Sequence, residues 1–203
     1  MQYLKRSNIT RLLFGLVIMA AGGQTAFALG TAASTSIDNR ATVNYDVGGV
    51  GQELIESSPT GNSTPGATNG ADTSFLVDNR VDLLVDNTTG NTVTPNDTTL
   101  VPLTFTLTNE GNETQNYFLT TQQVTSPTDD FDMQNVAIYI ENGLQAGFQD
   151  SGANADTLYN PATGTGDIAA DGVITVYVVG NTDAINPTNG QTSSIHLQAQ
   201  TLN

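Results

Sequence analysis

The sequence predicts an all-β protein built as an antiparallel β-sandwich of about seven to nine strands. Apolar residues recur at every second position in several short runs, which is the period of a half-buried strand. No segment after residue 28 shows the apolar spacing of a long helix. All seven prolines lie in expected connections or at strand starts, where they interrupt no ladder of hydrogen bonds.

The first 28 residues predict a secretory signal peptide. Three basic residues precede the apolar run 12–21, and the small-x-small sequence Ala-Phe-Ala follows at 26–28. The apolar run is about ten residues long, whereas a membrane span needs roughly 20. We therefore expect residues 1–28 to be removed and the chain from Leu29 to be secreted or held at the cell surface, with the periplasm as the alternative.

The chain is acidic, with 20 Asp and Glu residues against 5 Lys and Arg residues in a length of 203. After removal of the signal peptide, Arg40 and Arg80 remain and no lysine is left. The lack of lysine excludes Schiff-base chemistry, and the lack of cysteine excludes thiol nucleophiles and cysteine metal sites. The negative charge repels nucleic acids and anionic lipids. We therefore expect no nucleic-acid partner and, after signal cleavage, no membrane span.

Residues 29–56 are expected to form an N-terminal β-hairpin or an exchangeable edge strand. Ile37, Val43, Tyr45 and Val47 share one parity, and Gly48-Gly49 offers a turn into a second, shorter strand. Residues 57–72 are rich in Ser, Thr, Gly, Asn and Pro, a composition that predicts a flexible linker or long loop.

Residues 73–203 are expected to form the sandwich. The clearest strand is 101–108, where Phe105 and its apolar neighbours alternate with threonines, so Phe105 is expected in the core. The turn at 109–112 predicts a hairpin between this strand and 115–122. Further strands are expected at 73–85, 135–141, 172–179 and 194–201.

The tetrapeptide Ile37-Asp38-Asn39-Arg40 is echoed by Val77-Asp78-Asn79-Arg80. Two interpretations stay open at this point. Two strands simply begin alike, or the two arginines each neutralise a neighbouring carboxylate.

Several of these segments resemble the bacterial conserved-repeat surface domain, the family filed as domain of unknown function eleven. The resemblance lies in SIDNRATVNY at 36–45, ESSP at 56–59, TFTLTNEGN at 104–112 and AADGVITVYVV at 169–179. It spans most of the chain from residue 31 to residue 202, and its motifs are those of a fold rather than of a catalytic site. The resemblance implies an immunoglobulin-like sandwich in a secreted or cell-surface protein of largely structural role.

The sequence predicts no catalytic site. His196 is the only histidine, and its parity is opposite to that of Ile195 and Leu197, so we expect its side chain to face solvent. Serine and threonine are abundant, but no base lies near them in the sequence. We therefore expect a protein that is not an enzyme.

Calcium is the one ion considered as a ligand, because it takes carboxylate and carbonyl oxygens. The candidate ligands are Asp129, Asp130, Asp132, Glu141 and Asp150. No other cofactor is expected. For glycans the usual stacking residue, tryptophan, is absent, and the substitutes would be Tyr117, Tyr139, Tyr159 and Tyr177.

These observations favour an exported, non-enzymatic structural or interaction protein of the cell surface or extracellular matrix, whose partners are itself or other cell-surface proteins. An N-terminal strand with Ile37, Val43, Tyr45 and Val47 at alternate positions could pair with an open sheet edge of a neighbouring copy. Head-to-tail exchange of this kind does not close and would grow filaments. One alternative is that the hairpin folds back onto its own domain. The others are a calcium-assisted adhesin and a glycan-binding module.

Overall fold

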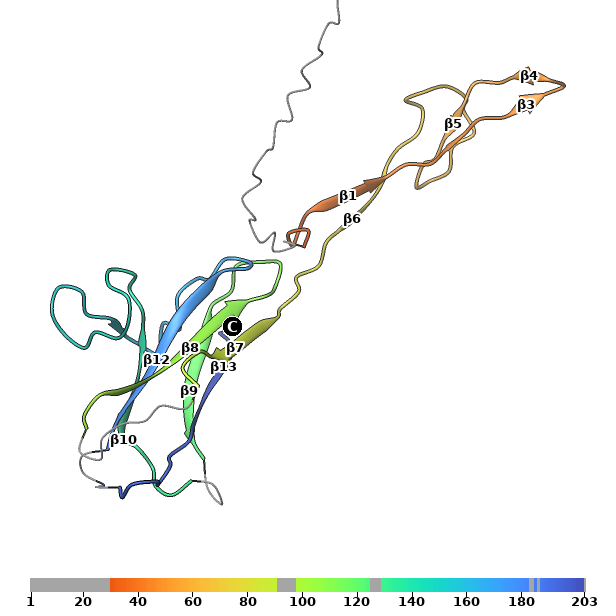
Figure 1. Cartoon of the computed structure of the whole chain (residues 1–203). Coiled ribbons are helices and arrows are strands. Elements are labelled where there is room, and N and C mark those ends of the chain that lie inside the picture. The colour runs from red at the N-terminus through yellow and green to blue at the C-terminus, as the bar shows by residue number, and fades with distance from the viewer. Residues whose placement is uncertain (1–29, 91–97, 125–128, 183–184, 186, 203) are drawn as a thin grey trace, which may run out of the picture.

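The structure is a computed structural model that describes residues 30–90, 98–124, 129–182, 185 and 187–202. The predicted signal peptide at 1–28 lies outside these residues. The described residues form thirteen strands and no helix, which confirms the all-β prediction. Within the same residues, no helix exists that could cross a membrane. Figure 1 shows a sandwich and a long arm that extends from one end of it.

One layer of the sandwich is a five-stranded antiparallel sheet. Its strands are β7 (Leu83–Asn87), β8 (Val101–Asn109), β10 (Gln134–Ile140), β11 (Thr157–Leu158) and β12 (Val173–Asn181). Their order across the sheet is β11-β10-β12-β8-β7.

The other layer is a two-stranded antiparallel sheet of β9 (Tyr117–Gln123) and β13 (Ile195–Thr201). The prediction of a hairpin between 101–108 and 115–122 is therefore wrong, because β8 and β9 lie in different sheets. Both edges of β8 are occupied, one by β7 and the other by β12, so no edge remains for β9. The chain crosses between the layers after β8, and β9 pairs with the last strand instead.

The core lies between the two layers and follows the alternation of the strands. Phe105 and Leu107 of β8 are buried, and the threonine between them is half-buried. They belong to one cluster with Leu119 of β9 and Leu197 of β13. Full burial of such a side chain contributes about 1.5–3 kcal/mol. The expected core position of Phe105 is confirmed.

The solvent-facing position of His196 is also confirmed. It lies between the buried residues Ile195 and Leu197 and is itself exposed.

A single buried side chain fixes the end of β8. Asn109 is fully buried, and its Nδ2 donates to the backbone oxygens of Glu113 and Ile168 at 2.8 and 2.9 Å and of Ala169 at 3.2 Å. Its Oδ1 accepts a hydrogen bond from Gly111 N at 3.0 Å. Because every polar atom of this side chain is paired, burial costs little and three backbone segments are held together.

The arm is a twisted two-stranded ribbon made of short strands. These are β1 (Ser36–Asn39), β2 (Thr42–Val43), β3 (Asp46–Val47), β4 (Val50–Gly51), β5 (Ile55–Glu56) and β6 (Thr73–Leu76). β1 pairs with β6, β2 with β5 and β3 with β4, all antiparallel. Gly48 and Gly49 form the tip with φ angles of 61° and 80°, as a two-residue type I′ hairpin turn requires.

Residues 57–72 form a closed loop inside the arm, where a flexible linker to the sandwich was expected. Ser57 N donates to Ala41 O at 2.8 Å, and Ala71 N donates to Ser57 O at 3.0 Å, so the loop leaves and rejoins the ribbon at one place. The chain then returns along β6 to pair with β1. Residues 73–76, expected as the start of the sandwich, thus belong to the arm, and the sandwich begins at Leu83.

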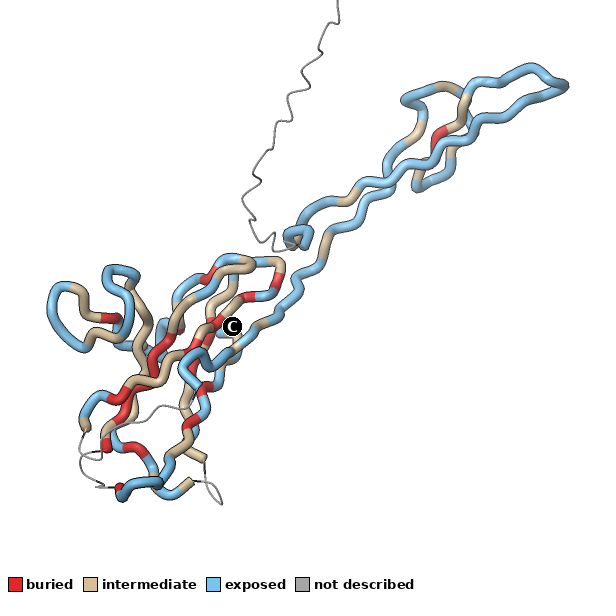
Figure 2. Tube along the Cα trace, in the orientation of Figure 1, coloured by how far each residue is buried: buried red, intermediate tan, exposed pale blue. Residues whose placement is uncertain are grey.

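Asn112 ties the base of the arm to the sandwich. Its Nδ2 donates to Thr31 O and Asp78 O at 3.1 and 3.0 Å, and its Oδ1 accepts from Arg80 N at 2.7 Å. Its backbone oxygen accepts from Ala33 N at 3.2 Å. The two segments that form the base of the ribbon are therefore anchored on one turn of the sandwich. The rest of the arm lies in solvent (Figure 2).

Candidate functional site

The arm exposes apolar side chains. Val43, Val47 and Phe75 are 59%, 60% and 60% exposed, and Val50 at the tip is 63% exposed. Exposed apolar side chains along an extended arm make it a candidate interaction site. Figure 2 shows that most of the arm is exposed, with Glu56 of β5 as its one buried described residue, whereas the other buried positions lie in the sandwich.

The structure places the four predicted strand-exchange residues on the arm. Val43, Tyr45 and Val47 lie on the strand that runs to the tip, at alternate positions, and all three are exposed. Ile37 lies nearer the base, where it is half-buried and pairs with Phe75. The hairpin does not fold back onto its own sandwich (Figure 1).

β13 has an edge that is free of hydrogen bonds. Leu202 N donates to Asn116 O at 2.8 Å, and Val124 N donates to Ser194 O at 2.9 Å. With the register of the pair, this places the backbone bonds to β9 on the even-numbered residues of β13. The backbone groups of the odd-numbered residues from 195 to 201 point to the other side. No described residue bonds to them.

The opposite edge of the same two-stranded sheet is covered. Tyr117 N donates to Thr165 Oγ1 at 3.0 Å, and Thr165 N donates to Tyr117 O at 2.9 Å. Leu119 N donates to the hydroxyl of Tyr159 at 2.7 Å. Proteins protect edge strands in this way because an unprotected edge accepts further strands. Within this two-stranded sheet, the edge of β13 is therefore the one that is open to a partner.

The predicted calcium ligands are not brought together. The carboxylate of Asp129 accepts from Ser194 N, and that of Asp130 accepts from Thr192 N at 2.8 Å. Both therefore close a loop by bonding to the backbone before β13. No cluster of three or more ligating side chains occurs among the residues that the structure describes, Asp132 included.

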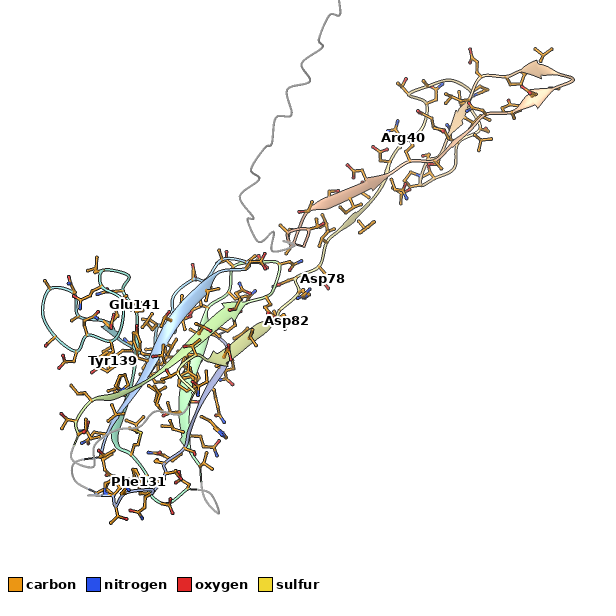
Figure 3. The ribbon with its side chains drawn as sticks, in the orientation of Figure 1. Arg40, Asp78, Asp82, Phe131, Tyr139 and Glu141 are labelled. Carbon is orange, nitrogen blue, oxygen red and sulfur yellow. The ribbon has the colours of Figure 1, made fainter. Side chains whose placement is uncertain are left out.

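Glu141 and Asp150 lie elsewhere, in the 141–156 loop (Figure 3 labels Glu141). Glu141 Oε2 accepts from the Tyr177 hydroxyl at 2.6 Å, and this bond holds the pKa of the carboxyl below its usual range. Asp150 bonds to the neighbouring Ser151 hydroxyl at 3.1 Å. The loop is held by these bonds and by the ring of Phe148, which packs on Tyr177 with centroids 5.6 Å apart.

The four tyrosines do not form an exposed platform for sugars. Tyr117 and Tyr177 are buried, and Tyr139 and Tyr159 are half-buried. A cavity of about 190 Å³ at the base of the arm is lined by Gly30, Arg80, Thr108, Glu110, Gly111, Asn112 and Asp171. Pockets for small molecules are usually about 300–1,000 Å³, so this one is too small to suggest a ligand of that size.

Comparison of the chain with family models, with curated proteins and with solved structures finds no match. The resemblance to the bacterial conserved-repeat surface domain therefore stays a prediction.

Sequence reasoning found the exposed strand but not the edge that would receive it. The alternation of Val43, Tyr45 and Val47 is visible in the sequence. Which edge of β13 is free depends on its pairing with β9, a contact between residues about 80 positions apart, and no local pattern reports it.

Proposed function

We propose that the chain is an exported, non-enzymatic structural protein of the cell surface or extracellular matrix, which assembles with further copies of itself through its N-terminal arm. The observation that carries the proposal is the arm itself, a ribbon that holds exposed valines and aromatic residues away from its own sandwich. A ribbon without a partner loses the stabilisation that burial of these side chains would supply.

The open edge of β13 supports the same function. Main-chain hydrogen bonds along a free edge provide affinity, and alternate side chains of the added strand provide specificity. An arm on one end of the molecule and an acceptor edge on its sandwich are two different surfaces. Contacts between two different surfaces are heterologous, so they continue from copy to copy and build a filament when the rotation between copies does not close a ring.

The composition limits the classes of partner. The acidic excess repels nucleic acids and anionic membranes, which leaves protein surfaces as the partners that the charge permits. In residues 41–47, which run to the tip of the arm, the exposed apolar side chains lie at alternate positions. One face of this segment is therefore apolar and the other polar. This division suits a strand that adds to a half-buried sheet.

Light scattering on the chain without residues 1–28 tests the proposal. We expect the scattering mass to rise with protein concentration and filaments to be visible by electron microscopy. The double substitution Val43→Asp and Val47→Asp should abolish both, because it places charges on the apolar face of the strand.

Leu144→Asp is the matched control. Leu144 is 67% exposed, similar to the two valines, but it lies in the 141–156 loop of the sandwich. This variant should assemble as the parent does. A parent protein that stays monomeric at high concentration contradicts the proposed function.

A further inference from the structure

We infer that the acceptor of the arm is a seam between β7 and β13 of a second copy, and that residues 41–47 of the arm fill it. The seam is defined here as the unpaired edge of β13 (Ile195–Thr201) together with the unpaired edge of β7 (Leu83–Asn87). The inference rests on the proposed function and names the partner surface for it.

β7 has a free edge of its own. Glu110 N donates to Asp82 O at 3.0 Å, and Thr88 N donates to Thr104 O at 3.1 Å. In the register of β7 with β8, these bonds place the even-numbered residues of β7 on the side of β8. The backbone groups of Leu83, Val85 and Asn87 point to the other side, and none of them bonds to a described residue.

The two free edges are neighbours and run in opposite directions. Some Cα atoms of β7 and β13 lie within 8 Å of each other, and the two strands form no ladder. Because a strand between them needs two strand spacings, about 10 Å, the two edges separate slightly when a strand enters the seam. β7 begins opposite the end of β8, since Leu83 pairs with Asn109. β13 ends opposite the start of β9, which follows β8 by one turn, since Thr201 pairs with Tyr117. The start of β7 and the end of β13 therefore lie at the same end of the sandwich (Figure 1).

In one orientation, a single added strand can form backbone hydrogen bonds with both edges. A strand that is antiparallel to β13 is parallel to β7. In an antiparallel pair, residues that exchange hydrogen bonds have side chains on the same face. If residues 41, 43, 45 and 47 bond to the odd-numbered residues of β13, their side chains face the core, like those of Ile195 and Leu197. The backbone N–H and C=O groups of Thr42, Asn44 and Asp46 then point toward β7.

This orientation matches the sequence of the arm. The inward positions would be Ala41, Val43, Tyr45 and Val47, and the side chains of Thr42, Asn44 and Asp46 would face solvent. Residues 41–47 and β13 are both seven residues long. In the register that pairs all of them, Tyr45 lies opposite Leu197. A slip by one residue would turn the polar face inward.

Few hydrogen bonds of the arm break when residues 41–47 leave the ribbon. Within the arm, residues 41–47 belong only to β2 and β3, which have two residues each. Their bonds to the ribbon include Gln52 N to Tyr45 O at 2.9 Å and Ser57 N to Ala41 O at 2.8 Å. Short, exposed pairings of this kind open with a small free energy. Pairing with β13 replaces these bonds and adds burial.

A buried hydroxyl next to the seam also lacks a partner. Tyr117 is fully buried, and its Oη bonds to no described residue. In the register of β9 with β13, Tyr117 lies opposite Thr201, at the end of the sandwich where β7 begins. Buried hydroxyls in folded proteins are normally hydrogen-bonded. A strand in the seam brings carbonyl oxygens to this end of the core.

The occupant is a second copy rather than the arm of the same chain. The arm is anchored at its base by Asn112, and the ribbon between β1 and β6 carries residues 41–47 away from their own sandwich (Figure 1). Head-to-tail exchange lets each copy donate one strand and accept one strand.

Cysteine cross-linking tests the seam, and the absence of native cysteines leaves no background. In the proposed register Asn44 and Gln198 form a non-hydrogen-bonded pair on the solvent face, with Cα atoms about 4.5 Å apart. This separation suits a disulfide. The variant with Asn44→Cys and Gln198→Cys should form a ladder of disulfide-linked multimers, with the 44–198 link identified by peptide mass spectrometry.

The control variant carries Asn44→Cys and Gln122→Cys. Gln122 is exposed like Gln198, and Gln198 Nε2 donates to Gln122 Oε1 at 2.9 Å, but Gln122 lies on β9. It is one strand farther from the seam and lies opposite His196 rather than Gln198, which places its Cα about 12 Å from that of Asn44. This variant should form no comparable link.

Four outcomes separate the possibilities. A ladder through the 44–198 link supports the seam. A 44–198 link within a monomer shows that the chain accepts its own arm and overturns the second copy as the occupant. Equal linking through residue 122, or assembly without a 44–198 link, overturns the seam and leaves the proposed function standing. A parent protein that never associates overturns both.

Discussion

Arg40 Nε donates a hydrogen bond to Asp72 Oδ1 at 2.7 Å and so joins two parts of the arm that are 32 residues apart in the chain. The same guanidinium lies 3.5 Å from Glu56. Figure 3 shows Arg40 on the ribbon, beyond β1. At the base of the arm, Arg80 bonds to Asp82 at 2.9 Å. In each case the tetrapeptide therefore provides a cation for a nearby carboxylate, and both arginines that follow residue 28 lie in the arm or at its base.

The arm should loosen in acid through Asp38. Asp38 Oδ1 accepts from Ser74 Oγ at 2.5 Å, across the ribbon, and from Ser36 Oγ at 3.0 Å. These bonds hold the pKa of Asp38 below its ordinary value. A lowered pKa stabilises the ribbon above the ordinary value of about 3.9, and this stabilisation is lost as the pH falls through the lower, folded value. NMR amide shifts of Ile37 and Phe75 should therefore change as the pH falls from about 5 to about 2.

Asp38→Asn is the control for this titration, because it keeps the shape of the side chain and removes its charge. In this variant the amide shifts of Ile37 and Phe75 should vary much less with pH. An equal pH dependence in the parent and the variant contradicts the role given to Asp38.

Phe105→Ala should lower the free energy of unfolding by roughly 3–5 kcal/mol, because it opens a cavity between the sheets. His196→Ala should leave it nearly unchanged, because the imidazole is exposed on the outer face of β13. Denaturant unfolding of the two variants measures both effects. The opposite ranking would falsify the assignment of inner and outer faces.

Tyr117→Phe should stabilise the monomer by about 1 kcal/mol, because it removes a buried hydroxyl without a bonded partner. The measurement is denaturant unfolding at a concentration where light scattering shows single chains. The same variant should assemble more weakly than the parent if a second copy supplies the missing acceptor. A loss of monomer stability would show that the hydroxyl is already satisfied in the single chain.

Ala199→Pro should block assembly. The Ala199 N–H points away from β9, so its removal leaves the ladder between β9 and β13 intact. Gln198→Pro is the comparison, because the Gln198 N–H belongs to that ladder and its loss should destabilise the monomer more than Ala199→Pro does. Circular dichroism melts rank the two monomers, and light scattering reports assembly. Normal assembly of the Ala199→Pro variant would exclude β13 as the acceptor edge.

Local patterns were enough to predict the strands but not their partners. The alternation around Phe105 marked β8, and the parity of His196 gave its exposure, because both depend on residues two positions apart. A turn after a strand predicts a hairpin, and this local pattern does not indicate the actual partners of β8, which are β7 and β12. In the folded chain the buried Asn109 and the anchoring Asn112 use that turn to bind distant backbone, and the chain changes layer there.

For the candidate site, too, the sequence indicates the local features but not the long-range pairings. The exposed alternation of Val43, Tyr45 and Val47 is a local property and was found in the sequence. The return of residues 73–76 to the arm was not found, because the pairing of Phe75 with Ile37 spans a loop whose composition indicates only flexibility. An edge is free when no other strand pairs with it. The free edges of β7 and β13 can therefore be identified only when all strand pairings of the described residues are known.

The position of Arg40 and Arg80 determines where proteases of the trypsin type can cut the chain after residue 28. Enzymes of the trypsin type cut after lysine or arginine, and the chain has neither beyond Arg80. Every such cleavage site therefore lies at or before the base of the arm, and the sandwich from Leu83 onward contains none. A digest with trypsin would detach the ribbon and leave the sandwich uncut. Packing of neighbouring copies around Arg40 and Arg80 would then decide whether the material is degraded or persists.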